Sequence, residues 1–132
     1  MKKKFLKKII ARSPEDLNLI SACCSEGKVK TSDIKYLQKN KIFLLSIDRF
    51  VKEKENNKSR INSIVKFDYI DSSKSKNINQ KTPDLMLELL AIDLFKRDQN
   101  YEIILLFSSN RIITLTAEII EVVLEDQKKL ND

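Results

Sequence analysis

The sequence contains no histidine, no tryptophan and only one glycine, and these shortages exclude several classes of functional site. Without histidine there is no imidazole to act as a general base or to bind zinc. A single glycine cannot form a glycine-rich phosphate-binding loop. Cys23 and Cys24 are adjacent, which is poor geometry for a disulfide, and two thiols without histidine make no ordinary zinc site. We therefore expect no catalytic residues, no metal site and no cofactor, and the sequence disfavours an enzyme.

The composition is nevertheless that of a globular protein, because 42% of the 132 residues are hydrophobic and 33% are charged. This length predicts one domain, residues 1–132, that is large enough to bury a core. A membrane helix needs about 18 or more consecutive apolar residues, and no run in the sequence approaches that length. Lys7 and Lys8 also interrupt the apolar stretch that a secretory signal requires. We expect a cytoplasmic protein with no membrane partner.

The net charge of +6 lies entirely in residues 1–12, which carry six basic side chains and no acidic one. The other 120 residues hold 19 basic and 19 acidic groups. Within them, residues 51–81 carry +4 (eight basic, four acidic) and residues 82–132 carry −5 (five basic, ten acidic). The body of the protein is therefore neutral but polarised, and only the N-terminal arm has charge of one sign.

One segment has clear helix signals. Ser13 is a good N-cap, Pro14 fits the first helical position, and two acidic residues follow at the positive end of the helix dipole. Three apolar residues then share one helical face: Leu17, Ile20 and Cys24. Gly27 stands where a left-handed C-terminal stop is favourable. These signals predict a helix over residues 14–25, with its cysteines packed in the core.

Runs of β-favouring residues predict strands at residues 4–12, 28–37, 41–51, 61–70, 101–107 and 112–116, with hairpin turns at 38–40 and 108–111. Two polar stretches, residues 53–60 and 71–82, are expected to be surface loops, and residues 1–4 a basic tail. Residues 83–95 and 118–126 fit either a helix or a strand, and β-branched side chains favour the strand for the second. The predicted fold class is α+β, a single domain of mostly antiparallel β-sheet with one capped N-terminal α-helix packed on it.

The most informative polar cluster is Asp48-Arg49-Phe50, at the end of a predicted strand. An arginine beside a carboxylate could bind an anion or a carboxylate of a partner, but structural ion pairs give the same juxtaposition and are the favoured interpretation. Asp126, beside Glu125, could pair with a cation or form the acidic end of a solvated element. The candidate ligand- or partner-binding residues are therefore Asp48, Arg49 and Asp126.

The N-terminal arm supplies candidate nucleic-acid contacts, namely Lys2, Lys3, Lys4, Lys7 and Lys8. The chain has only six phenylalanines and three tyrosines, and no aromatic ladder accompanies these cations. The arm therefore supports a salt-dependent contact with RNA that is blind to sequence, and no DNA specificity. The competing interpretation is an ordinary solvated lysine-rich surface.

Short segments spaced along nearly the whole chain form a recognisable series. They are Glu15-Asp16-Leu17, Ile20-Ser21-Ala22, Asp33-Ile34, Asp48-Arg49-Phe50, Phe67-Asp68, Leu89-Leu90-Ala91-Ile92, Leu106-Phe107, Leu115, Glu118, Ile120-Glu121 and Leu124-Glu125-Asp126. In their order and spacing, from about residue 5 to 127, the chain resembles a family of small alphaproteobacterial proteins, the domain of unknown function DUF2948. The resemblance implies no particular activity. It implies a strand rather than a helix over residues 85–95, and Ser108-Ser109-Asn110 stands where relatives have a glycine-rich turn.

These observations lead to three functional hypotheses. The first is a non-enzymatic cytoplasmic interaction or accessory module with a protein partner, motivated by the missing catalytic groups and by the charge polarity of the body. The second is weak RNA or ribosome association through the basic N-terminal arm. The third is a small-molecule-binding enzyme centred on Asp48 and Arg49.

Overall fold

The computed structural model describes residues 6–51, 59–79, 81–82 and 84–127. Antiparallel strands and one α-helix make up most of this part of the chain. The predicted α+β class is therefore confirmed, with a mostly antiparallel sheet and the helix packed against it in a single domain. The predicted tail at residues 1–4 and most of the predicted loop at 53–60 lie outside the described residues, and Arg60 begins a strand.

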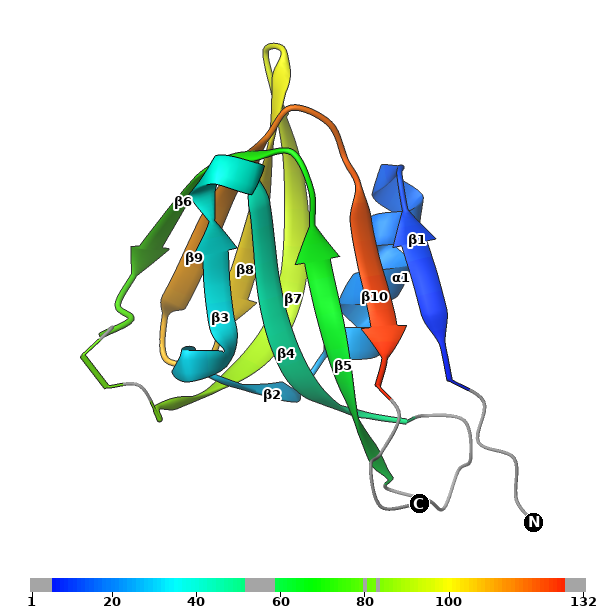
Figure 1. The fold of residues 1–132 in the computed structure, drawn as a ribbon, viewed down its shortest axis with the longest axis vertical. Coiled ribbons are helices and arrows are strands. Elements are labelled where there is room, and N and C mark those ends of the chain that lie inside the picture. The colour runs from blue at the N-terminus through cyan, green and yellow to red at the C-terminus, as the bar shows by residue number, and fades with distance from the viewer. Residues whose placement is uncertain (1–5, 52–58, 80, 83, 128–132) are drawn as a thin grey trace.

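The elements follow one another along the chain as β1 (Lys8–Ala11), α1 (Pro14–Cys24), β2 (Gly27–Lys30), β3 (Ile34–Leu37), β4 (Ile42–Phe50), β5 (Arg60–Phe67), β6 (Ile70–Lys76), β7 (Met86–Arg97), β8 (Asn100–Phe107), β9 (Arg111–Ala117) and β10 (Val122–Asp126). Short 3₁₀ turns, η1 (Thr31–Asp33) and η2 (Gln38–Asn40), flank β3. The strand order is β1-β10-β5-β4-β2-β7-β8-β9-β6, and β3 pairs with β4 beside β2. The sheet bends over on itself, so β7, β8 and β9 lie behind the layer of β3, β4 and β5 (Figure 1).

The interior of this curved sheet is filled by the inward side chains of alternating strand positions. On β4 every second residue is buried, beginning with Phe43, Leu45 and Ile47. Phe43 meets Phe67 of β5 edge to face, with ring centroids 5.8 Å apart and planes at 70°. This alternation fixes the register of the strands, because a slip by one residue would expose the whole apolar set.

The helix α1 begins as its sequence predicts. The Ser13 hydroxyl accepts a hydrogen bond from the backbone N–H of Asp16 at 3.2 Å, and proline occupies the first turn. Its buried face carries Leu17, Ile20 and Cys24. Among the described residues, no helix has the length and apolar character needed to cross a membrane.

The helix also covers part of one edge of β7 that would otherwise be exposed. β7 pairs with β2 only over Met86–Leu89, and beyond this point the freed side of β7 lies against α1. There the Ser21 hydroxyl accepts a hydrogen bond from the backbone N–H of Ile92 at 2.9 Å. A side chain of the helix thus satisfies a backbone donor that would otherwise have no strand partner.

Several sequence predictions are wrong in detail. Residues 71–82 are not a loop throughout, because 71–76 belong to β6 and pair with β9. Residues 28–37 are not one strand, because η1 separates β2 from β3. Gly27 does not provide a left-handed stop, because the residue with positive φ is Glu26 (67°) and Gly27 already belongs to β2. In each case tertiary pairing outweighed the local preference of the residues.

The two ambiguous segments are both strands. β7 covers most of residues 83–95, and β10 covers the end of 118–126. The turn between β8 and β9 keeps a backbone that glycine favours, because Ser109 and Asn110 have φ values of 63° and 58°. A turn without glycine therefore still adopts the left-handed conformation.

Candidate functional site

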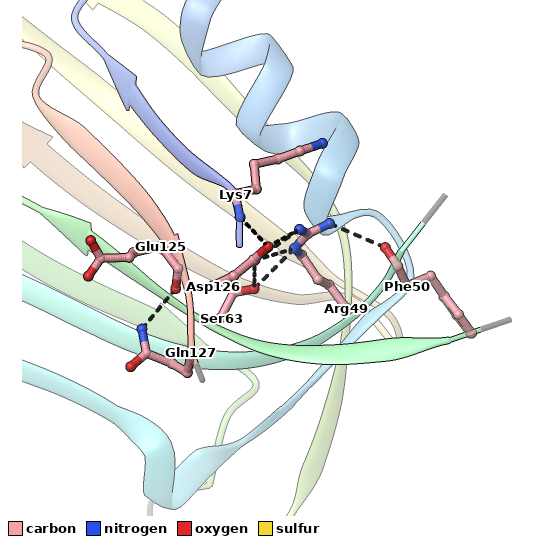
Figure 2. Close-up of polar contacts among 7 residues, drawn as sticks. All are labelled: Lys7, Arg49, Phe50, Ser63, Glu125, Asp126 and Gln127. Carbon is pink, nitrogen blue, oxygen red and sulfur yellow. Dashed lines mark hydrogen bonds and ion pairs between the residues drawn. The ribbon is translucent and has the colours of Figure 1, made fainter. Parts of the chain in front are cut away.

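Three polar side chains meet inside the sheet, at Arg49 of β4, Ser63 of β5 and Asp126 of β10 (Figure 2). The Arg49 Nη2 group donates to the two carboxylate oxygens of Asp126 at 2.8 and 2.9 Å. Its Nε group donates to Asp126 Oδ1 at 3.1 Å and to Ser63 Oγ at 3.0 Å. The Ser63 hydroxyl donates in turn to Asp126 Oδ1 at 2.6 Å. Both charged side chains are only 3% exposed, so this is a buried, bidentate ion pair.

The strand register explains how three residues distant in sequence come together. Asp126 lies directly opposite Ser63, and Ser63 lies opposite Ile47. Arg49 is two residues beyond Ile47 and therefore projects from the same face of β4. All three side chains occupy the inward phase of their strands, in positions that are apolar further along each strand.

The remaining polar atoms of this cluster also have partners. The backbone N–H of Lys7 donates to Asp126 Oδ2 at 2.9 Å, and Arg49 Nη1 donates to the Phe50 carbonyl at 3.3 Å. No buried side-chain nitrogen or oxygen among the described residues lacks a hydrogen bond. Burial raises the pKa of Asp126, but hydrogen bonds from Ser63, Lys7 and Arg49 and the arginine charge outweigh it, so the pKa is lowered. The carboxylate therefore stays ionised beside its arginine.

This arrangement joins elements from both ends of the chain. The backbone N–H of Asp126 donates to the Lys7 carbonyl at 2.9 Å, so the same aspartate connects to the start of β1 through its backbone and its side chain. Arg49 and Asp126 use their hydrogen-bonding groups on each other and on neighbouring strands. The pair is suited to holding β1, β10, β5 and β4 in register. Its hydrogen-bonding groups are already used within the protein and are not presented to a substrate.

Asp48 lies on the opposite face of β4 from Arg49, because successive side chains of a strand alternate. Its Oδ2 atom forms an ion pair with Arg60 Nη1 at 3.1 Å. The Arg60 guanidinium also lies 4.3 Å from the centre of the Phe50 ring, a cation–π contact. The structure therefore brings Arg49 and Asp126 together and places Asp48 in a separate surface pair.

The basic arm is only partly described, because Lys2, Lys3 and Lys4 lie outside the described residues. Lys8 forms an ion pair with Glu125 at 3.4 Å, across the pairing of β1 with β10. Arg12 forms an ion pair with Glu121 at 2.9 Å. Part of the positive charge of the arm is therefore balanced by acidic side chains of the C-terminal half.

The cysteines are poorly placed for chemistry. Burial, and to a smaller extent Cys23, raises the pKa of the Cys24 thiol to about 12, against a lowering by Arg49. A thiol with such a pKa carries almost no thiolate at neutral pH and is a weak nucleophile. Among residues 6–51, 59–79, 81–82 and 84–127 no group of three or more acidic or cysteine side chains is placed to hold a metal ion.

The chain also contains a cavity that the sequence did not indicate, between β3 and β6. Its volume is about 390 Å³, within the range of ligand pockets, about 300–1,000 Å³. Apolar residues and hydroxyl-bearing residues share its lining: Ile34, Tyr36, Phe43, Ile78, Ile113, Thr31, Ser32, Ser73 and Ser75. We call this cavity and the two strands that flank it the β3–β6 cleft.

Hydrogen bonds join the segments at the two ends of the β3–β6 cleft. At one end the backbone N–H of Ile70 donates to the Lys41 carbonyl at 2.8 Å, and the Tyr36 hydroxyl donates to the Ile70 carbonyl at 2.9 Å. At the other end the Thr31 hydroxyl donates to the Thr82 carbonyl at 2.7 Å. Between these ends β6 slants away from β3 (Figure 1). A second hollow, at the β7–β8 turn, is lined only by polar or charged residues: Arg97, Asp98, Gln99, Asn100, Glu102 and Thr116.

Comparison with known proteins identifies the family. The model of the family described as proteins of unknown function, DUF2948, matches residues 7–131. The chain belongs to the DUF2948 family. A solved structure similar to this DUF2948 protein is that of an uncharacterised protein from Neisseria gonorrhoeae, with 18% identity, 90% of this chain and 97% of the other covered, and a TM-score of 0.48. No curated protein matches the chain.

Signals for the inward polar cluster were present in the sequence of this DUF2948 protein. Arg49 continues the inward phase of Phe43, Leu45 and Ile47 on one alternating strand. A charged residue at such a position requires a buried partner. Nothing in the sequence, however, identifies that partner as Asp126, because the pairing of β10 with β5 is a long-range contact.

The stability of the DUF2948 protein is expected to fall in acid through Asp126. Its folded-state pKa lies below the ordinary value of 3.8, so the unfolded chain binds this proton more readily than the folded one. The contribution is complete above about pH 5 and is lost as the pH falls through the folded-state pKa. Urea unfolding between about pH 2.5 and 7 measures this loss, and Asp126→Asn should have a shallower acid dependence than the wild type. An unchanged slope in the variant would contradict the assignment.

Proposed function

We propose that this protein is a non-enzymatic cytoplasmic interaction module that binds its partner at the β3–β6 cleft. The observation that carries the proposal is the meeting of two strand edges over a partly apolar cavity. Among the described residues β3 pairs only with β4, and β6 pairs only with β9, so each has one edge without a strand neighbour. Such edges present backbone N–H and C=O groups to any chain that can pair with them.

The other strand edges of the described sheet are either covered or short. The side of β7 that β2 leaves free lies against α1 and receives the hydrogen bond of Ser21. The end strand β1 also has one edge without a strand neighbour among the described residues, but it pairs over only four residues, Lys8–Ala11, and so offers a short edge. Natural sheets generally cover or block their edges, so the pair of edges at the β3–β6 cleft is the natural place for a partner.

The side chains of the cleft favour binding over chemistry. Its polar lining consists of serine and threonine hydroxyls and of Tyr36, whose hydroxyl is engaged by the Ile70 carbonyl. Hydroxyls of this kind need an adjacent base to act as nucleophiles, and no histidine exists in the chain. The buried ion pair of Arg49 with Asp126 is not part of the cleft lining. These features support recognition of a partner rather than its conversion.

Affinity capture with two matched variants tests the proposal. Ser75 lines the cleft, whereas Ser72 lies on the outer face of the same strand. Ser75→Trp should block the cleft, and Ser72→Trp introduces the same bulk outside it. From native lysate at low and high salt, the wild type and Ser72→Trp should retain the same protein, and Ser75→Trp should lose it, with circular dichroism confirming that both variants fold.

Three results would overturn this proposal. Equal capture by Ser75→Trp and Ser72→Trp would place the interaction outside the cleft. Capture that ribonuclease abolishes would instead support the RNA hypothesis, with the basic arm as its contact. Turnover of a metabolite by the purified protein, lost on blocking the cleft, would support an enzyme.

A further inference from the structure

We propose that the partner contributes an extended segment of alternating acidic and apolar residues, which pairs as an added strand with the free edge of β6. This inference rests on the proposed function, since it specifies what enters the β3–β6 cleft. Strand addition to an exposed sheet edge is a recurring mode of peptide recognition, in which the backbone gives affinity and alternate side chains give specificity. The two faces of β6 define which side chains the added strand would need.

The edge of β6 is long enough to pair with a short segment. After a register shift between Ile70 and Ser72, the five residues from Ser72 to Lys76 pair without interruption with Thr116 to Ile112 of β9. At about 3.3 Å per residue, such a stretch accommodates an added strand of about five residues. Its other side has no strand partner among the described residues.

The inward face of β6 calls for apolar residues in the added strand. Ser73 and Ser75 lie opposite Leu115 and Ile113 of β9, whose side chains are buried, so both serines face inward. Serine is too small to cover the apolar surface beneath it, and the cavity of about 390 Å³ lies there instead. Side chains that extend from an added strand opposite these two serines would enter this cavity. Its apolar lining favours branched aliphatic or aromatic side chains.

The outer face of the cleft calls for acidic residues. Lys74 and Lys76 project outward from β6, and Lys35 projects outward from β3 on the other side. All three side chains are exposed, and none of them forms an ion pair with any described residue. Residues of an added strand that lie opposite Lys74 and Lys76 would be direct cross-strand neighbours, where opposite charges are favoured. Acidic residues on this face would thus alternate with apolar residues on the other.

The same lysines argue against a second copy of this chain as the occupant. Pairing of β6 with β6 of another copy would bring the lysines of two like-charged edges together. Lysine on an edge strand is a common device against such self-association. Charge complementarity therefore favours an acidic segment of a different protein.

A designed peptide provides the probe. The probe is a fluorescein-labelled nine-residue peptide in which glutamate alternates with isoleucine and valine, and its binding to the full chain is followed by fluorescence anisotropy. Lys74→Glu should weaken binding about three- to tenfold. Lys96→Glu reverses the charge of another exposed strand lysine, far along β7, and should leave binding unchanged.

Two modified peptides test the geometry without altering the protein. A peptide with lysine in place of glutamate should not bind, because its charges would face those of Lys74 and Lys76. N-methylation of alternate backbone nitrogens, placed on the pairing side, should abolish binding because it removes the donors that strand addition uses. Equal binding of the methylated peptide would overturn the inference, as would equal binding by Lys74→Glu.

Failure of the added-strand inference and failure of the proposed function give different experimental results. If Ser75→Trp loses a captured partner and the acidic peptide neither binds nor competes with it, the added-strand inference is wrong and the interaction module stands. If a small neutral molecule co-purifies in the cleft and blocks the captured partner's site, the inference is equally overturned. If Ser75→Trp loses no partner, the cleft itself is wrong as the site.

Discussion

Replacing Asp126 with alanine is expected to lower the free energy of unfolding by about 3–5 kcal/mol, because it leaves the Arg49 guanidinium buried without a counter-charge. In the wild type this guanidinium is 3% exposed and makes three hydrogen bonds to the Asp126 carboxylate. Alanine removes all three, and it also removes the acceptor for the Ser63 hydroxyl and the Lys7 N–H. Urea unfolding followed by circular dichroism measures the loss.

The neighbouring carboxylate provides a matched control. Asp48 also pairs with an arginine, but its side chain is 45% exposed and that of Arg60 is 34% exposed. Exposed ion pairs contribute about 0–1 kcal/mol, so Asp48→Ala should have a small effect. Equal losses for Asp48→Ala and Asp126→Ala would contradict the view that burial makes the difference.

A variant that lacks both charges distinguishes two quantities: the destabilisation caused by a buried unpaired charge, and the stability that the ion pair itself contributes. Replacing a buried pair with apolar residues of similar volume is often neutral or stabilising. Arg49→Met combined with Asp126→Leu should therefore recover most of the stability that Asp126→Ala loses. If the double variant were as unstable as the single one, the pair itself would be a main source of stability.

Gly27→Ala is expected to destabilise the protein by about 1–3 kcal/mol through overpacking. A Cβ atom at this position would lie 2.5 Å from Ile47 Cδ1, 2.7 Å from Ile47 Cγ1 and 2.9 Å from the Cys24 carbonyl oxygen. Ile47 is fully buried, and the carbonyl belongs to the end of α1, so neither neighbour can move without disturbing the packing. The backbone of Gly27 is not left-handed, so the cost arises from space and not from φ.

A double variant tests the source of this cost. Ile47→Val removes Cδ1, the atom nearest the added methyl group, at an expected cost of about 0.5–1.5 kcal/mol by itself. Gly27→Ala with Ile47→Val should lose less stability than the sum of the two single variants, because the changes share one contact. Additive losses, or a Gly27→Ala protein as stable as the wild type, would contradict the predicted contact.

The close approach at Gly27 also explains why the predicted left-handed helix stop at this residue was wrong. A lone glycine after a helix is typical of a left-handed C-terminal stop. Here Glu26 adopts the positive φ, and the glycine allows β2 to pass close to β4 beneath the end of α1. A glycine that ends a helix and a glycine that permits close packing look the same in the sequence, and only the tertiary contact distinguishes them.

Much of the fold followed from local patterns. The capping serine, the proline and the three-residue apolar face were sufficient to place α1, because helix signals act within a few residues of each other. Runs of β-favouring residues placed β4, β8 and β9 for the same reason. The shortage of histidine and glycine likewise restricted the range of possible sites without reference to any contact.

The single glycine and the missing histidine were therefore informative from the sequence alone, since residues that are absent cannot act in any fold. The partners of Arg49 and the existence of the β3–β6 cleft were decided only by tertiary structure. Arg49 meets Asp126 because β10 lies between β1 and β5 in the sheet. The two residues are 77 positions apart in the sequence. β6 is a strand because β9 pairs with it, although its serines and lysines have little β-preference of their own. Long-range pairing of the backbone leaves no local trace in the sequence, and the proposed site depends on that pairing.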